Sequence, residues 1–200
     1  MASVRRVLPT RLVPRVVTAY KEQAAVVATR KGSVADRVDV SRSCDVFISH
    51  RGTDTKRTLA GLLYDRLVHH NVRPFLDNRT MEPGDKLYEC IDAGILRCKV
   101  GVVIFSPRYC DSFFCLHELA MMVEAKKKLI PIFCDVKPSQ LLVLDAESHS
   151  PENLKRYSNA LQEAKYTVGL TFDSKTGNWS ELVSRTANIV MKCMKEGKDR

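Results

Sequence analysis

At residues 44–55 the chain reads Cys44-Asp45-Val46-Phe47-Ile48-Ser49-His50-Arg51-Gly52-Thr53-Asp54-Thr55. The apolar run from Val46 to Ile48 predicts a buried strand, and the residues after it form a polar turn with one glycine. Thr53 to Thr55 are residue types that favour the start of a helix. In a parallel α/β sheet, such a strand–turn–helix unit opens onto the edge where ligands bind, beyond the carboxyl ends of the strands.

Strand and helix patterns alternate along the rest of the chain. The continuous apolar run from Val100 to Phe105 predicts a strand that is buried on both faces, like the central strand of a parallel sheet. Strands are expected near residues 46–48, 72–76, 99–105, 129–133 and 168–172, and helices after residue 55, after 85, from 112 to 128, at 151–166 and at 179–194. Five β/α units without a repeat predict an α/β fold, a flavodoxin-like five-stranded parallel sheet flanked by helices on both faces.

The predicted helices have apolar residues at helical spacing. Leu59, Leu62, Leu63 and Leu67 are expected on the buried face of the first helix. Leu87, Ile91 and Ile95 recur every four residues in the segment that Asp85 opens, and they are expected on one face.

The composition limits the number of domains and the kinds of site. Two hundred residues with 44% hydrophobic content can bury one sizeable core. The longest uncharged stretch, Val100 to Pro107, is too short to span a bilayer. Seven cysteines without a CxxC pair are typical of a reducing compartment. Cys110, Cys115 and His117 lie close together, but no second ligand pair follows at zinc spacing, so no metal site is expected.

Most of the net charge of +9 lies in the first 43 residues, which contain nine Lys and Arg residues and three acidic residues. These residues lack a sustained period, so we expect a disordered basic extension at 1–43, a folded domain at 44–195 and a polar tail at 196–200. The Arg-rich composition up to Thr29 also suits an organelle transit peptide, although serine is scarce. Only +3 remains after residue 43, so the basic pI gives little support for a nucleic-acid partner.

A second polar motif, Ser112-Phe113-Phe114-Cys115-Leu116-His117-Glu118-Leu119, follows the predicted central strand. Ser112 is expected to cap a helix, and Glu118 lies one turn inside that helix. Because both motifs follow parallel strands, Glu118 and the turn at Arg51 are expected to meet at one cleft. The helix dipole is expected to favour the ionised form of Glu118. Cys115 has no base to activate it and is expected to pack in the core.

Four motifs, in this order and spacing, resemble those of a known family. They are Asp45-Val46-Phe47-Ile48-Ser49, Arg51-Gly52-x-Asp54-Thr55, Ser112-x-x-Cys115-Leu116-x-Glu118-Leu119 and Ile130-Pro131-Ile132-Phe133-x-Asp135-Val136. Together they resemble a plant Toll/interleukin-1 receptor (TIR) domain, and the whole chain resembles a TIR-only protein. The resemblance implies a five-stranded parallel sheet flanked by helices. It also implies an NAD⁺ hydrolase that releases nicotinamide plus ADP-ribose and cyclic or variant cyclic ADP-ribose, as an immune and cell-death signal.

By the same resemblance, Glu118 corresponds to the catalytic glutamate. NAD⁺ is then the substrate, and no cofactor is expected. Nicotinamide leaves as a neutral base from a cationic pyridinium, so no general acid is needed. One carboxylate that holds the ribose and stabilises an oxocarbenium-like transition state is sufficient, in contrast to the paired acids of ordinary glycosidases. The expected substrate-binding residues are His50, Arg51, Gly52, Thr53, Ser112 and Phe114.

Two of these positions depart from the family pattern. Plant relatives usually carry Trp where this chain has Phe114, and Phe where it has His50. The ring of Phe114 can still stack on a ribose or nicotinamide ring. Gly52 permits a close backbone approach, and Arg51 either pairs with the pyrophosphate or holds neighbouring loops. Asp54 is expected to cap a helix and not to bind a ligand.

The loop at residues 77–84 resembles the family's mobile loop, which covers or frees the cleft during assembly. The residues expected to move are Asp77, Asn78, Arg79 and Gly84. The resemblance also implies homotypic TIR contacts through helix surfaces, including the segment from Thr58 to Asp65, and other TIR proteins as further partners.

Two other functions are compatible with these motifs. Many animal TIR domains are non-enzymatic self-association adaptors, but a pure adaptor does not need Glu118 in its flanking motif. A nucleic-acid-acting 2′,3′-cNMP synthetase activity also occurs within the family, and the basic extension suits it. The expected location is cytoplasmic or nuclear, with organelle targeting by residues 1–30 as the alternative and no membrane partner.

Overall fold

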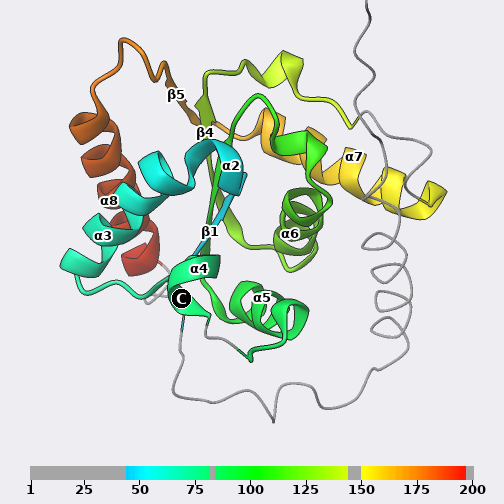
Figure 1. The fold of residues 1–200 in the computed structure, drawn as a ribbon, viewed down its shortest axis with the longest axis horizontal. Coiled ribbons are helices and arrows are strands. Elements are labelled where there is room, and N and C mark those ends of the chain that lie inside the picture. The colour runs from blue at the N-terminus through cyan, green and yellow to red at the C-terminus, as the bar shows by residue number, and fades with distance from the viewer. Residues whose placement is uncertain (1–43, 82–83, 144–149, 197–200) are drawn as a thin grey trace, which may run out of the picture. The chain divides into compact units, whose positions relative to one another are not determined.

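The computed structural model describes residues 44–81, 84–143 and 150–196 (Figure 1). The basic extension predicted for residues 1–43 lies outside these residues, as do residues 197–200 of the predicted tail. Glu196, which was expected to begin that tail, is the last residue of helix α8 (Trp179–Glu196).

Five parallel strands form one sheet in the order β2-β1-β3-β4-β5. The strands are β1 (Val46–His50), β2 (Pro74–Phe75), β3 (Val100–Phe105), β4 (Lys128–Cys134) and β5 (Leu170–Phe172). This is the strand order of flavodoxin-like folds, so the predicted fold class is confirmed. The order reverses between β1 and β3, and folds of this kind bind ligands in the crevice at that position.

Helices cover both faces of the sheet, as predicted. α3 and α8 pack on one face, and α5, α6 and α7 pack on the other (Figure 1). The helices before α8 are α2 (Gly52–Thr55), α3 (Gly61–His69), α4 (Asp77–Thr80), α5 (Leu87–Arg97), α6 (Phe113–Glu124) and α7 (Pro151–Tyr166). A π-helical segment, η1 (Lys56–Ala60), joins α2 to α3, and two 3₁₀ turns are η2 (Tyr109–Asp111) and η3 (Pro138–Gln140).

The central strand β3 contributes side chains to two separate cores. Val103 and Phe105 belong to the core beneath α5, α6 and α7, whereas Val102 and Ile104 belong to the core beneath α3 and α8. Successive residues of a strand point to opposite faces, so both faces of β3 must be apolar. This requirement explains the unbroken apolar run in the sequence.

The first helical region differs from the prediction at Leu62. This side chain is 48% exposed, whereas Leu59, Leu63 and Leu67 are fully buried. The non-helical residue of η1, Thr58 (φ −122°, ψ −110°), comes before Leu59, so Leu59, Leu62 and Leu63 lie on one continuous helical run. Leu59, Leu63 and Leu67 are spaced by four residues and form one buried stripe, whereas Leu62 is turned about 100° around the helix from Leu63 and lies at the edge of that stripe.

Some element ends also differ from the prediction. β2 contains only Pro74–Phe75 of the predicted residues 72–76, and β5 contains only Leu170–Phe172 of residues 168–172. Leu87 is 41% exposed because it is the first residue of α5, whereas Ile91 and Ile95 lie in the core as predicted.

Candidate active site

Helix α6 brings Glu118 against the end of strand β1. Leu116 and Leu119 are buried in the core and fix the helix on the sheet. Glu118 is 9% exposed, and its Oε2 lies 2.7 Å from the Oγ of Ser49. The thiol of Cys115 donates to the carbonyl oxygen of His50 at 3.4 Å. The two sequence motifs therefore meet at one edge of the sheet, and Cys115 packs in the core as expected.

Two hydroxyl groups next to Glu118 did not enter the sequence-based prediction of the site. Ser49 and Tyr109 are both fully buried, and their oxygens lie 2.7 Å apart. The Tyr109 hydroxyl also lies 3.0 Å from the carbonyl oxygen of Cys115. Ser49 carries one signal in the sequence, because it is the first polar residue after the apolar run from Val46 to Ile48. Tyr109 carries no such signal, because it lies in the segment that follows the predicted central strand.

The environment of Glu118 is unfavourable to a negative charge. Burial raises the pKa of Glu118 to about 8, and the negative charges of Asp77 and Asp92 add to the rise, while the hydrogen bond from Ser49 opposes it. The prediction that the helix dipole favours the ionised form was therefore wrong. The dipole acts within the first turn of a helix, whereas Glu118 is the sixth residue of α6 and lies in a desolvated position.

The end of β1 and the residue after it hold two buried nitrogen atoms without a hydrogen-bond partner in the described part of the chain. These atoms are the Nε2 of His50 and the Nε of Arg51. Burial lowers the pKa of His50, so its imidazole is neutral near pH 7. Buried polar atoms in proteins almost always have a partner, and an unpartnered pair at a sheet edge is suited to a ligand or to ordered water.

Asp54 has a different role from the one predicted. It lies inside α2, whose N-cap residue is Arg51, so the carboxylate does not cap the helix. Its oxygens accept from the Ser106 hydroxyl at 2.7 Å and from the guanidinium of Arg108. Although burial opposes ionisation, these hydrogen bonds hold the pKa of Asp54 below its usual range. Asp54 therefore connects the turn after β1 to the turn after β3.

Gly52 and Thr53 are the first two residues of α2. A Cβ atom on Gly52 would meet only the side chain of Lys56, at 3.8 Å, so the chain itself does not require glycine here. Thr53 is exposed, and its hydroxyl donates to Asp54 at 3.2 Å. Their predicted roles in substrate binding stay predictions.

Phe114 stacks on Tyr88 of α5 with the ring centroids 5.6 Å apart and the planes 4° from parallel. Burial and the charge of Asp92 raise the pKa of Tyr88 to about 12, so its hydroxyl is neutral. Ser112 caps α6 as predicted, and its oxygen accepts from the backbone N–H of Cys115 at 3.4 Å. A further role of Ser112 and Phe114 in substrate binding stays a prediction.

The predicted mobile loop begins as the short helix α4, which includes Asp77, Asn78 and Arg79. Lys56 donates to Asp77 at 3.3 Å, and Arg79 pairs with Asp65 of α3. Arg79 also lies over the ring of Tyr64, 5.1 Å from its centroid. These contacts hold α4 against the first helical region. Gly84 has a φ of +102°, which favours glycine, and the movement of the loop stays a prediction.

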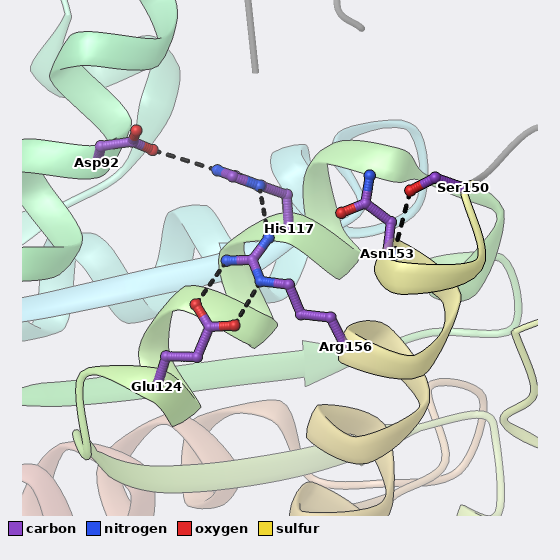
Figure 2. A network of polar contacts seen from close by, with 6 residues as sticks. All are labelled: Asp92, His117, Glu124, Ser150, Asn153 and Arg156. Atoms are coloured by element: carbon purple, nitrogen blue, oxygen red, sulfur yellow. Dashed lines mark hydrogen bonds and ion pairs between the residues drawn. The ribbon is translucent and has the colours of Figure 1, made fainter. Parts of the chain in front are cut away.

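A polar network next to Glu118 fixes α6 between its two neighbouring helices (Figure 2). His117 Nε2 lies 3.3 Å from Asp92 of α5, and its Nδ1 lies 3.2 Å from Arg156 of α7. Arg156 also donates twice to Glu124, at 2.5 Å and 2.7 Å. A guanidinium group can only donate, so Nδ1 accepts and Nε2 carries the hydrogen that points to Asp92. The network thus connects α5, α6 and α7.

The sequence matches the family model for the TIR domain over residues 46–164. The chain belongs to the TIR domain family. The resemblance of its four motifs to a plant TIR domain is therefore confirmed.

This TIR domain is similar to one plant protein of comparable length and to much longer plant resistance proteins. It is 48% identical to the probable 2′ cyclic ADP-D-ribose synthase BdTIR of Brachypodium distachyon over 200 residues, which cover 96% of this chain and 89% of that protein. It is 36% identical over 143 residues to the TMV resistance protein N of Nicotiana glutinosa, which cover 64% of this chain but only 12% of that protein. Disease resistance protein RPS4B of Arabidopsis thaliana is 30% identical over 76% of this chain and 14% of its own length.

Among solved structures, the TIR domains of the activated Roq1 resistosome, which directly recognises the pathogen effector XopQ, are similar to this TIR domain. The TM-score is 0.64 with 25% identity, over 74% of this chain and 99% of that one. TIR domains therefore occur in oligomeric assemblies.

Two observations concern the described residues as a group. None of their helices is long and apolar enough to cross a membrane. No three His, Cys, Asp or Glu side chains among them are placed to hold a metal ion together.

Proposed function

We propose that this TIR domain cleaves the nicotinamide N-glycosidic bond of NAD⁺, with Glu118 as the catalytic carboxylate. The observation that carries the proposal is the position of Glu118, which is a buried carboxylate at the ligand-binding edge of the sheet. Its pKa of about 8 is typical of a functional and not of a solvated surface glutamate. The 48% identity to a probable 2′ cyclic ADP-D-ribose synthase supports the same reaction.

The reaction needs stabilisation of positive charge more than proton transfer. The bond between the ribose and nicotinamide breaks with both electrons leaving on nicotinamide, which departs as a neutral base. The ribose C1′ becomes electron-poor, and ionised Glu118 stabilises it while holding the ribose hydroxyls. Water then adds to C1′ and releases a proton to solvent to give ADP-ribose, or a hydroxyl of the same molecule adds and releases its proton to give a cyclic product. By similarity to BdTIR, we propose a cyclic ADP-ribose among the products.

The other predicted substrate-binding residues suit distinct parts of NAD⁺. The unpartnered Nε of Arg51 is a donor for the pyrophosphate, and neutral His50 offers an imidazole beside the ribose. Phe114, backed by Tyr88, provides an aromatic face for the nicotinamide ring. Gly52 and Thr53, at the start of α2, follow Arg51 directly and complete the proposed set of substrate-binding residues. Homotypic assembly, with movement of the loop at residues 77–84, completes this proposal.

The decisive experiment is mass analysis of NAD⁺ incubated with concentrated wild-type protein and with Glu118→Gln. Gln keeps the size of the side chain but removes the negative charge, so turnover should fall by about 10²–10³ while NAD⁺ still binds. Glu163→Gln, on the exposed side of α7, is the matched control and should keep full activity. Retention of most turnover by Glu118→Gln would exclude Glu118 as the catalytic carboxylate, whereas the absence of NAD⁺ cleavage by wild type would favour a non-enzymatic adaptor or a nucleic-acid-acting enzyme.

A further inference from the structure

Glu118 is the first member of a buried chain of oxygen atoms. Its Oε2 lies 2.7 Å from the Oγ of Ser49, which lies 2.7 Å from the hydroxyl of Tyr109. That hydroxyl lies 3.0 Å from the carbonyl oxygen of Cys115. Ser49 and Tyr109 are fully buried, and Cys115 and Glu118 are nearly so. Each of these contacts has hydrogen-bond length and requires one hydrogen atom between its two oxygens.

The number of available hydrogens depends on the charge of Glu118. Ser49 and Tyr109 supply one hydrogen each, and the carbonyl of Cys115 supplies none. If Glu118 is ionised, one of the contacts lacks a hydrogen, either between the two hydroxyls or between Tyr109 and the carbonyl. If Glu118 is protonated, it donates to Ser49, Ser49 donates to Tyr109, and Tyr109 donates to Cys115. Every contact is then a hydrogen bond. The protonated form is therefore favoured, because two buried oxygens in contact without a hydrogen between them are unfavourable.

We propose that Tyr109, acting through Ser49, is a positioning residue that holds Glu118 as a neutral carboxylic acid in the resting chain, so that Glu118 must lose a proton to water before it can stabilise a ribosyl cation. The inference rests on the proposed function of Glu118. It adds a step that precedes bond cleavage, and Tyr109 never touches the substrate in this role.

The groups that surround Glu118 also favour its neutral, protonated form. Asp77 from α4 and Asp92 from α5 add negative charge, which disfavours a third carboxylate. His50 at the end of β1 is neutral because burial lowers its pKa. Burial also raises the pKa of Tyr109 and of Cys115, so neither carries a charge near pH 7. Charged groups nearby are Arg51, which acts on Cys115, and Lys56, which pairs with Asp77.

Two substitutions should shift the titration of Glu118 in opposite directions. Tyr109→Phe removes the group that competes for the Ser49 hydrogen, so Ser49 donates freely to ionised Glu118 and the pKa should fall by about one unit. Ser49→Ala removes the donor to the carboxylate, so the pKa should rise. A residue that only fills space would produce neither the opposite signs nor a shifted pH profile. The ring of Tyr109 packs on Phe105, with centroids 4.7 Å apart, and Phe preserves that contact.

The test is infrared difference spectroscopy of the protein without NAD⁺, following the carbonyl band of a protonated carboxyl between pH 5 and 10. Glu118→Gln assigns the band. Support requires a band at pH 7 that disappears near pH 8 in wild type, earlier in Tyr109→Phe and later in Ser49→Ala. A wild-type Glu118 that is already ionised at pH 6, or shifts of the same sign, would overturn the proposal.

Activity provides a second readout. Lowering the pKa from about 8 to about 7 increases the ionised fraction at pH 7 about five-fold, so Tyr109→Phe should cleave NAD⁺ about five-fold faster at that pH. The two proteins should have similar rates at pH 9.5. If Glu118→Gln stays active, the proposed function fails, but the infrared titration still decides the protonation state. If Tyr109→Phe does not fold, the titration of Ser49→Ala against wild type decides it.

Discussion

Glu118 makes the folded chain sensitive to pH. The folded chain retains the Glu118 proton up to about pH 8, whereas the unfolded chain releases it near 4.5. Between these values the unfolded chain binds fewer protons, so the free energy of unfolding falls as pH rises. A shift of this size corresponds to roughly 3–5 kcal/mol at pH 8 and above.

Glu118→Gln should therefore be more stable than wild type, by an amount that grows from pH 5 to pH 8 and then stays constant. Urea unfolding at pH 5, 6.5, 8 and 9 measures the difference. Glu163→Gln, at an exposed position, should match wild type throughout. Equal stability of wild type and Glu118→Gln at pH 8 would show that Glu118 is ionised without penalty in the fold.

A substitution of Arg51 can distinguish the two roles predicted for this residue, which are binding the substrate and supporting the neighbouring loops. Its unpartnered Nε favours binding, so Arg51→Gln should raise the KM for NAD⁺ about 10- to 100-fold with little change in Tm. Arg66→Gln, on the exposed face of α3, serves as the control. A lower Tm with an unchanged KM would assign Arg51 to loop support.

The sequence predicts Glu118 better than the residues that control it. Glu118 stands in a local motif on a capped helix, and this pattern can be read within eight residues. Ser49 and Tyr109 act through distances between three separate elements, and the two residues are 60 positions apart in the sequence. The raised pKa depends on how completely α6 covers the carboxylate, which no local pattern records.

At the scale of elements, the helices with strong end signals were predicted best. α7 begins at Pro151 after the capping residue Ser150 and ends at Tyr166, as expected from the sequence. The π turn at Thr58 could not be predicted, because residues 56–60 carry no glycine or proline that would indicate a break. Leu62 was assigned to the buried face because a spacing of three residues from Leu59 also fits a helix, but it lies at the edge of the stripe that Leu59, Leu63 and Leu67 form.

The contacts of His117 explain how α6 keeps its orientation. His117→Ala removes the contacts with both Asp92 and Arg156, and should lower stability by about 1–2 kcal/mol. It should also reduce NAD⁺ turnover, because Glu118 is the next residue of the helix. Thermal unfolding and NAD⁺ cleavage measure the two effects. His69→Ala at the exposed end of α3 is the control, and a stability equal to wild type in His117→Ala would show that the network contributes little.

At the scale of the molecule, the position of α4 bears on assembly. The pairs Lys56–Asp77 and Arg79–Asp65 hold α4 against the first helical region in this single chain. If the loop at residues 77–84 must rearrange within an assembly, NAD⁺ cleavage per chain should rise with protein concentration or crowding. Initial rates over a hundred-fold range of concentration measure this. A constant rate per chain down to dilute monomer would indicate a preformed cleft.

The two cores on opposite faces of the sheet have a consequence for biosynthesis. Val102, Ile104 and Ile132 lie in the same core as Leu182 and Val190 of α8. A ribosome completes α3, β3 and β4 well before α8, so the part of this apolar face that α8 covers, beside α3, stays exposed until the last helix is made. The other face waits only for α7. The nascent chain therefore presents a specific, transient surface to chaperones, and a premature stop before α8 leaves that surface permanently open.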